Sequence, residues 1–227
     1  MPYRTGPSTK LRTGPSTTLR TGLYAITDGP RDDLTAAARA ALGGGAAMLQ
    51  YRDKTRDRDR RLQEARALAA LCDEFSVPLI LNDDLDLARA SRAAGVHLGE
   101  DDATITDARR ALGPGAIIGV SCYDSLERAR SAAAAGADYL AFGAFFPTST
   151  KSVTRRATTA LLREAKDFGL PLVAIGGITP DNGGPLVAAG ADYLAAISGV
   201  FGAADIQAAT RRYAQCFQPR IDTDKHG

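Results

Sequence analysis

Ala134-Ala-Gly-Ala-Asp-Tyr-Leu140 occurs a second time at residues 188–194, and Ala93-Ala-Gly-Val96 is a shorter version of the same stretch. In each copy an alanine-containing segment ends at a glycine, and an apolar run follows at once. Glycine at this place can adopt the left-handed conformation that commonly ends a helix. The repeated stretch therefore predicts that a helix ends at the glycine of each copy and that a strand begins directly after it.

Short apolar runs of this kind recur along the chain and alternate with helical patterns. Their predicted starts lie near Leu23, Ala47, Pro78, Gly95, Ala116, Asp138, Leu172 and Asp192. Between them lie stretches rich in Ala, Leu, Arg and Glu, such as 57–75, 124–135 and 158–168. Strands that are apolar almost throughout are typical of parallel sheets buried on both faces. Eight such strand–helix units predict an α/β fold, a single (β/α)8 TIM barrel over residues 22–217.

The rival fold is an open, doubly wound sheet. Its glycine-rich turn should follow the first strand, yet the first strand here leads into Thr27-Asp-Gly-Pro30. The length of 227 residues also suits a barrel, which takes roughly 200 to more than 400 residues. We therefore favour the closed barrel.

Composition narrows the function classes. Charged residues make up 24% of the chain and the net charge is only +2, which gives no reason to expect a nucleic-acid or membrane partner. No apolar run approaches the roughly 18 residues of a membrane span. Three cysteines at unrelated spacings and only two histidines argue against a disulfide framework, a zinc site or a histidine-based hydrolase. We expect a cytoplasmic protein with small-molecule substrates, and the sequence leaves homo-oligomer formation open.

The two ends of the chain differ from the rest. Residues 4–22 repeat with a period of eight, and Gly-Pro occurs in the copies that begin at Arg4 and Arg12. Because Gly-Pro pairs prevent a continuous amphipathic helix, the repeat favours a disordered extension over 1–21 rather than a transit peptide. We expect that deleting residues 2–21 leaves activity and melting temperature nearly unchanged, and that 218–227 form a flexible tail.

Polar side chains gather where the predicted strands end, which is the working face of such a barrel. The second strand runs into Gln50-Tyr-Arg-Asp-Lys54. In an extended chain Gln50, Arg52 and Lys54 point to one side, where they suit a heterocycle plus an anionic group. The alternative is a solvated run of charges, and we assign that interpretation to residues 56–61.

The third and fourth strands end in acidic residues, Asn82-Asp-Asp84 and Glu100-Asp-Asp102. Carboxylates on neighbouring strand ends can share one hard cation, and Mg²⁺ usually takes one or two carboxylates plus substrate phosphates. The alternative is that these residues cap the helices that follow. Each acidic end alone favours a cap, whereas the two together suggest a metal site.

The later strands lead into loops that suit phosphate. After the sixth strand, Phe146-Pro-Thr-Ser-Thr-Lys151 offers hydroxyls and an ammonium group, although an ordinary turn has a similar composition. The seventh strand ends in Ile175-Gly-Gly-Ile178 and the eighth in Ile197-Ser198, and these two loops often form the phosphate site of a barrel. We interpret His97 as a hydrogen-bonded core histidine and Cys122 as a buried small residue.

Together these motifs resemble the thiamine-phosphate synthase family over about residues 23–209. The matching motifs, each at a strand end, are Leu49-Gln-Tyr-Arg-Asp-Lys54, Leu81-Asn-Asp-Asp84, Gly95-Val-His-Leu-Gly-Glu-Asp-Asp102, Gly119-Val-Ser121, Pro147-Thr-Ser-Thr-Lys151, Ile175-Gly-Gly-Ile178 and Ile197-Ser198. The resemblance implies an Mg²⁺-dependent transferase. It would join 4-amino-2-methyl-5-hydroxymethylpyrimidine diphosphate to a thiazole phosphate, releasing pyrophosphate and forming thiamine phosphate.

The resemblance also implies roles for individual residues. Those that would hold the pyrimidine diphosphate are Gln50, Tyr51, Arg52, Asp53, Lys54, Asn82, Ser121 and Lys151, of which Arg52, Lys54, Ser121 and Lys151 would be catalytic. Asp83 and Asp102 would bind Mg²⁺. The thiazole phosphate would be held by Thr148, Ser149, Thr150, Gly177, Ile197 and Ser198.

This chain departs from the family pattern at two places. Tyr123 stands where the family often has His, and Glu100-Asp-Asp102 replaces the usual Gln-Glu-Asp, which leaves a choice between Asp101 and Asp102 for the metal. Two alternatives to the synthase are a thiazole tautomerase-like isomerase and a non-catalytic binding protein of the thiamine pathway. Neither needs both the cations Arg52 and Lys54 and an intact carboxylate pair.

Overall fold

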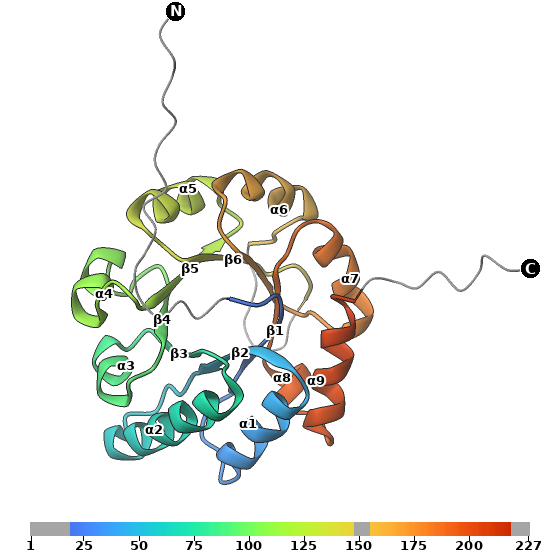
Figure 1. The fold of residues 1–227 in the computed structure, drawn as a ribbon. Helices are drawn as coiled ribbons and strands as arrows, with labels where there is room; N and C mark the ends of the chain where they lie inside the picture. Colours follow the sequence, from blue (N-terminus) through green and yellow to red (C-terminus); the bar gives the residue numbers. More distant parts are fainter. Residues whose placement is uncertain (1–18, 148–154, 219–227) are drawn as a thin grey trace, which may run out of the picture.

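The computed structural model describes residues 19–147 and 155–218, which form a closed barrel of parallel strands inside a ring of helices (Figure 1). Each strand pairs with its neighbours in chain order, and the last pairs with the first. The strands are β1 (Gly22–Ile26), β2 (Ala46–Tyr51), β3 (Leu79–Asn82), β4 (Gly95–Leu98), β5 (Ile117–Tyr123), β6 (Tyr139–Phe142), β7 (Leu172–Ile175) and β8 (Tyr193–Ala196). Each begins within one residue of its predicted start, so the predicted TIM barrel is confirmed.

The helices follow the strands as the alternation predicts. They are α1 (Leu34–Gly43), α2 (Arg58–Phe75), α3 (Leu85–Ser91), α4 (Ile105–Leu112), α5 (Leu126–Ala135), α6 (Thr159–Ala165), the 3-10 turn η1 (Lys166–Phe168), α7 (Pro180–Ala188), α8 (Ser198–Phe201) and α9 (Ile206–Gln215). Many begin at a side chain that accepts a hydrogen bond from the first turn. These caps are Asp57, Asp84, Thr104, Ser125, Thr158 and Asp205.

The repeated Ala-Gly-Ala-Asp-Tyr-Leu stretch performs the same structural task twice. Gly136 and Gly190 have φ of 93° and 109°, the left-handed region that ends a helix. The aspartate that follows accepts a hydrogen bond from the preceding strand: Ile118 N–H donates to Asp138 at 2.8 Å, and Leu172 N–H donates to Asp192 at 2.9 Å. The motif therefore both ends a helix and fastens the next strand to its neighbour.

The third, shorter copy does not follow this rule: a strand begins at Gly95 as predicted, but the prediction that a helix ends there was wrong. Arg92, with φ of 58°, takes the left-handed position at the end of α3, and Gly95 is the first residue of β4. A Cβ on Gly95 would lie 1.8 Å from the carbonyl oxygen of Ile117. Glycine is therefore required here by the close approach of β5, not by the helix end.

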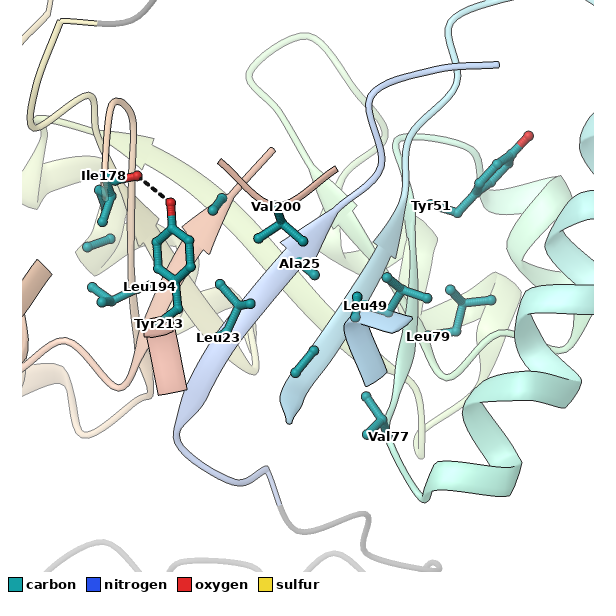
Figure 2. Close-up of a cluster of buried hydrophobic side chains, with 14 of the residues drawn as sticks. Leu23, Ala25, Leu49, Tyr51, Val77, Leu79, Ile178, Leu194, Val200 and Tyr213 are labelled. Carbon is teal, nitrogen blue, oxygen red and sulfur yellow. Dashed lines mark hydrogen bonds between the residues drawn. The ribbon is translucent and has the colours of Figure 1, made fainter. Parts of the chain in front are cut away.

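Alternate residues of each strand enter two separate hydrophobic layers. Outward-facing side chains such as Leu23, Leu49 and Leu194 pack under the helices (Figure 2). Inward-facing residues include three buried tyrosines, of which Tyr24 packs edge-on against Tyr139 and Tyr193 with ring centroids 5.9 and 6.4 Å apart. Each such ring pair contributes about 0.5–1.5 kcal/mol beyond the burial of its surface.

The start of the described chain touches the barrel. Leu19, inside the stretch predicted to be a disordered extension, is partly buried and packs against the inner cluster. Residues 1–18 and 219–227, on which the rest of the predictions for the two termini fall, lie outside the described residues. Among residues 19–147 and 155–218, no helix is both long and apolar enough to cross a membrane.

Candidate functional site at the carboxyl ends of the strands

The strand register brings the predicted polar residues to one level inside the barrel. Gln50 pairs with Ile80, Asn82 pairs with His97, and His97 pairs with Gly119, two residues before Ser121. All of these positions lie at or near the carboxyl end of their strands. The register therefore places Gln50, Asn82 and Ser121 around the mouth of the barrel, as the sequence predicts.

A chain of hydrogen bonds crosses the barrel interior between Gln50 and Ser121. Gln50 Nε2 lies 2.6 Å from the Tyr24 hydroxyl, which lies 2.9 Å from the hydroxyl of Tyr139. His97 completes the chain, with Nδ1 2.9 Å from Tyr139 and Nε2 2.9 Å from Ser121 Oγ. Two predicted binding residues are thus joined through three core side chains.

His97 is uncharged at neutral pH. Burial lowers the pKa of its imidazole to about 4, against a smaller opposing effect of the Asp102 carboxylate. Its ring stacks on that of Tyr139 at a centroid distance of 5.6 Å. The interpretation of His97 as a hydrogen-bonded core histidine is confirmed.

Gly119 makes room for this chain. A Cβ at Gly119 would lie 1.8 Å from Cζ of Tyr139, inside the phenol ring. Glycine is therefore the residue that lets the Tyr139 ring reach across to His97. The Gly119-Val-Ser121 motif thus contributes twice to the hydrogen-bond chain: Gly119 leaves space for Tyr139, and Ser121 bonds to His97.

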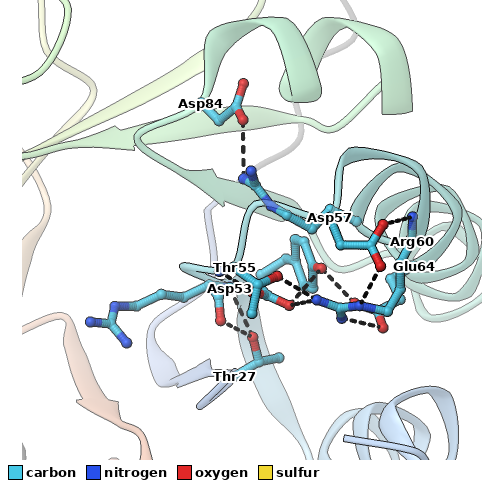
Figure 3. A network of polar contacts seen from close by, with 10 residues as sticks. Thr27, Asp53, Thr55, Asp57, Arg60, Glu64 and Asp84 are labelled. Carbon is cyan, nitrogen blue, oxygen red and sulfur yellow. Dashed lines mark hydrogen bonds and ion pairs between the residues drawn. The ribbon is translucent and has the colours of Figure 1, made fainter. Parts of the chain in front are cut away.

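The backbone at Arg52 is fixed by Thr27, a buried residue directly after β1. Arg52 N–H donates to Thr27 Oγ1 at 2.8 Å, and the Thr27 hydroxyl donates back to the Arg52 carbonyl at 3.2 Å (Figure 3). Within residues 19–147 and 155–218, neither the Arg52 guanidinium nor the exposed Lys54 ammonium forms an ion pair. The Lys54 charge does act on the Asp83 carboxylate, whose pKa it lowers. Both cations remain outside any ion pair among the described residues and are available for an anionic ligand.

Tyr51 and Asp53 point the other way, into a polar network with α2. The Tyr51 hydroxyl donates to Glu64 at 2.5 Å, and Arg60 donates to Asp53 at 2.7 Å (Figure 3). Burial alone would raise the pKa of Asp53, but hydrogen bonds from Thr55 and Arg60 hold it below its usual value. This geometry gives these two predicted binding residues a scaffold role and no contact with the Gln50–Ser121 chain.

Asp83 and Asp102 approach each other, as a shared cation site requires. Their carboxyl groups lie close enough to interact, and burial followed by this interaction raises the pKa of Asp83 to about 6. Asp83 also accepts a hydrogen bond from Asn82, and Asp102 accepts one from the Gly99 N–H. Asp83 has φ of 64°, a left-handed conformation that is uncommon for non-glycine residues, although Asp tolerates it better than most.

The alternative interpretation, that the acidic residues cap helices, holds for Asp84 and not for Asp83. Asp84 accepts from Leu87 N–H at the start of α3 and pairs with Arg61 at 3.0 Å, whereas Thr104, not an aspartate, caps α4. Asp101 is exposed. Asp83 and Asp102 are the two carboxylates that interact with each other, and they could hold a metal together.

The carboxylate pair suits Mg²⁺ in number and charge. In the part of the chain that the structure describes, no group of three or more His, Cys, Asp or Glu side chains could hold a metal ion. A pair without a bound cation is held in mutual repulsion, which a dication would relieve. Mg²⁺ needs no more than one or two protein carboxylates when substrate phosphates complete its shell.

The loops after β7 and β8, which we call the phosphate corner because the sequence predicts phosphate binding there, lie side by side. Ile175 pairs with Ala195, so Gly177 and Ile197 follow at the same level. Ser198 begins α8, whose first N–H groups have no acceptor inside the helix. A Cβ on Gly177, which has φ of 63°, would lie 2.3 Å from the Pro147 carbonyl. The predicted residues Thr148, Ser149, Thr150 and Lys151 lie outside the described residues.

Tyr213 of α9 packs against both loops of the phosphate corner, at Ile178 and at Gly199. Its hydroxyl donates to the Ile178 carbonyl at 2.8 Å (Figure 2), and a Cβ on Gly199 would lie 2.2 Å from the same hydroxyl. The side chain is buried. Both phosphate-corner loops therefore rest on one tyrosine.

Comparisons with known proteins agree with this arrangement. The family model described as thiamine monophosphate synthase matches residues 23–200. The chain belongs to the thiamine monophosphate synthase family. The thiamine-phosphate synthase of Xanthomonas campestris pv. campestris strain 8004 is 56% identical over 196 residues, which are 86% of this chain and 95% of the relative. That of Nitrosococcus oceani is 52% identical over 199 residues, 86% of this chain and 92% of the relative.

A solved structure shows the same fold. The thiamine phosphate pyrophosphorylase of Pyrococcus furiosus is 36% identical and superposes with a TM-score of 0.78, covering 87% of this chain and 95% of its own. The expectation that this barrel is a transferase of thiamine biosynthesis is confirmed at the level of the family. The matched range ends before α9, the helix that carries Tyr213.

Tyr123 stands at the position where the family resemblance led us to expect a histidine. Tyr123 has φ of 55°, and the guanidinium groups of Arg155 and Arg128 lie 5.0 and 5.8 Å from the centroid of its ring. Arg128 also donates to the Ser121 carbonyl at 2.6 Å and to the Gly99 carbonyl at 2.8 Å. Arg128 thus fixes the strand ends that carry Ser121 and lead to Asp102.

Sequence reasoning missed Arg128, Tyr24 and Tyr139. Arg128 lies in a helix whose composition looks like an ordinary exposed face. The two tyrosines sit in apolar strands, where a buried aromatic is the common outcome. Two features of the sequence could have drawn attention to Tyr139. It belongs to the repeated stretch, and the glycine that makes room for its ring, Gly119, lies in the motif that contains Ser121.

Proposed function

We propose that this chain joins 4-amino-2-methyl-5-hydroxymethylpyrimidine diphosphate to a thiazole phosphate, releasing pyrophosphate and forming thiamine phosphate. The observation that carries the proposal is the meeting of two opposite features at one end of the barrel. The cations of Arg52 and Lys54 form no ion pair among the described residues, although the Lys54 charge lowers the pKa of Asp83, and the carboxylates of Asp83 and Asp102 face each other. A diphosphate with a divalent metal satisfies both features.

The polar side chains around the mouth of the barrel suit the pyrimidine ring. Gln50, Asn82 and Ser121 carry amide and hydroxyl groups at the carboxyl ends of β2, β3 and β5. Gln50 is buried, and its side chain is held by Tyr24. Such fixed donors and acceptors can orient a heterocycle that has ring nitrogens and an exocyclic amino group.

The reaction needs charge neutralisation and alignment more than acid–base catalysis. The bond between the pyrimidine methylene carbon and the diphosphate oxygen breaks, and its electron pair leaves with pyrophosphate. The electron-rich aminopyrimidine spreads the positive charge that remains on the methylene group, and the thiazole nitrogen lone pair then forms the new C–N bond. The task of Arg52 and Lys54 is to stabilise the negative charge that develops on the leaving group.

Mg²⁺, held by Asp83 and Asp102, would supply further positive charge to the diphosphate as a Lewis acid. We assign Lys151 the same electrostatic role as Arg52 and Lys54, by resemblance to the family. The thiazole phosphate falls to Gly177, Ile197 and Ser198, with the hydroxyls of Thr148, Ser149 and Thr150. The free thiols of Cys72, Cys122 and Cys216 suit a reducing compartment, and we place the reaction in the cytoplasm.

Pyrophosphate release tests the proposal directly. The enzyme is mixed with the two substrates in Mg²⁺, and pyrophosphate is measured with and without EDTA. We expect release that requires both substrates and stops in EDTA. Interconversion of thiazole tautomers without pyrophosphate would indicate the isomerase, and binding without turnover would indicate the non-catalytic binding protein; either result excludes the synthase.

A further inference from the structure

The hydrogen-bond chain inside the barrel has a direction. We propose that Tyr24, Tyr139 and His97 are positioning residues that make Gln50 present its carbonyl oxygen, and Ser121 its hydroxyl proton, to the ligand. The proposal rests on the proposed function only in taking that ligand to be an aminopyrimidine. None of these three side chains needs to touch the substrate for the proposal to hold.

The direction follows from the proton count along the chain. Gln50 Nε2 can only donate, so the Tyr24 oxygen accepts, and within the described residues the Tyr24 proton has Tyr139 as its acceptor. The Tyr139 proton then points to Nδ1 of His97, which must be bare. A neutral imidazole carries one proton. It therefore lies on Nε2 and is donated to Ser121 Oγ.

Both ends of the chain are left with defined hydrogen-bonding groups. The Ser121 oxygen already accepts from His97, so its own proton is free to donate. Gln50 uses one of its two amide N–H bonds on Tyr24, which fixes the orientation of the amide and leaves its carbonyl oxygen free to accept. The opposite direction would require the Gln50 amide to be turned over and the His97 proton to sit on Nδ1. The imidazole tautomer therefore reports which direction is present.

This arrangement suits a 4-aminopyrimidine and disfavours its 4-oxo analogue. An amino group can donate to the Gln50 oxygen, and a bare ring nitrogen can accept from the Ser121 hydroxyl. The 4-oxo analogue exchanges the exocyclic donor for an acceptor and protonates one ring nitrogen. A site that fixes its own donors and acceptors rejects a ligand that leaves them unmatched. The chain would thus determine specificity for the amino form.

The tautomer can be read in the free protein. The whole sequence contains only His97 and His226, so ¹⁵N-histidine labelling gives two ring systems, and His226→Gln identifies the signal of His97. We expect the proton of His97 on Nε2 in the free protein. Tyr139→Phe and Tyr24→Phe should each release the tautomer into a mixture, because either change breaks the chain that begins at Gln50. A proton on Nδ1, or a Tyr139→Phe tautomer identical to that of the parent, would overturn the proposal.

Selectivity is the second measurement, and Tyr193→Phe is its matched control. Tyr193 is the third buried tyrosine of the inner cluster, and its hydroxyl has no hydrogen-bond partner among the described residues. Binding of the 4-amino and 4-oxo hydroxymethylpyrimidines is compared by calorimetry. We expect the preference for the amino form to fall roughly tenfold in Tyr24→Phe and Tyr139→Phe and to remain in Tyr193→Phe. Equal preference in all three variants would refute the positioning role.

Failure of this inference can be told from failure of the proposed function. If the tautomer is fixed as expected but neither pyrimidine binds, the chain is correct and the substrate assignment fails. If the parent enzyme releases pyrophosphate normally but Tyr139→Phe keeps its tautomer and selectivity, the function stands and the positioning role fails. For all variants, KM for the thiazole phosphate should stay within about twofold, because that substrate binds at the β7–β8 corner.

Discussion

Replacing Asp83 by asparagine tests whether the carboxylate pair is kept for a ligand at the expense of the fold. Asp83 and Asp102 are in contact, and burial together with this contact raises the pKa of Asp83 from 3.8 to about 6. Because the folded-state pKa lies above the unfolded-state value, the folded protein binds this proton more tightly. The stabilisation from that proton is complete below about pH 4 and is lost as the pH rises through about 6.

The size of the effect follows from the same values. A rise from 3.8 to about 6 corresponds to at most about 3 kcal/mol. Asp83 is only half-buried, and solvent screening reduces this to about 1 kcal/mol. Asparagine cannot ionise, and it tolerates the left-handed conformation that Asp83 adopts at φ of 64°. In EDTA near pH 8, Asp83→Asn should therefore raise the melting temperature by about 2–4 °C, and near pH 4 the gain should vanish.

Thermal denaturation followed by circular dichroism at both pH values measures this. Asp84→Ala is the matched control, because it removes the cap of α3 and the ion pair with Arg61 and should lower the melting temperature at either pH. Asp83→Asn should also raise the Mg²⁺ concentration needed for half-maximal turnover. A lower melting temperature of Asp83→Asn near pH 8 would refute the repulsion, and an unchanged Mg²⁺ titration would remove Asp83 as a ligand.

Three further predictions concern the cation, the phosphate corner and the chain start. Arg52→Ala should lower kcat by orders of magnitude with an unchanged melting temperature, and wild-type kinetics would remove Arg52 from the leaving-group site. Tyr213→Phe should cost about 1 kcal/mol of unfolding free energy in urea and raise KM for the thiazole phosphate but not for the pyrimidine; equal changes in both would refute the local role. Deleting 2–18 should leave the melting temperature unchanged, whereas deleting 2–21 should lower it slightly through loss of Leu19, and identical curves would show that this contact contributes nothing.

The strand starts were predictable because local chemistry repeats at them. Glycine that ends a helix and an apolar run that follows are both visible in sequence, and Gly136 and Gly190 behave as the pattern predicts. Gly95 looks the same in sequence but is required by the carbonyl of Ile117. That contact is made across the sheet, between β4 and β5, and does not show in the local sequence. A local pattern therefore identifies the strand but not always the reason for its glycine.

The site was predictable where strand alternation decides the direction of a side chain. Gln50 and Arg52 could be assigned to one side because strand residues alternate. The connection of Gln50 to Ser121 could not, because it runs through two tyrosines that sequence alone cannot distinguish from ordinary core residues. Asp83 and Asp84 posed a similar difficulty. Only the left-handed backbone of Asp83 turns one carboxylate toward Asp102 while the other caps α3.

Alternation also divides the Gln50–Lys54 motif into two roles, and this gives a last prediction. Arg52 has its backbone fixed by Thr27 and its guanidinium free of partners among the described residues, whereas Asp53 is buried against Arg60 and Thr55. Asp53→Asn should therefore lower the melting temperature, because it leaves Arg60 without its closest carboxylate. KM should change little in the protein that remains folded. If Asp53→Asn instead raised KM for the pyrimidine diphosphate at an unchanged melting temperature, Asp53 would be a binding residue after all, and the assignment of outward-facing residues to the scaffold would be wrong.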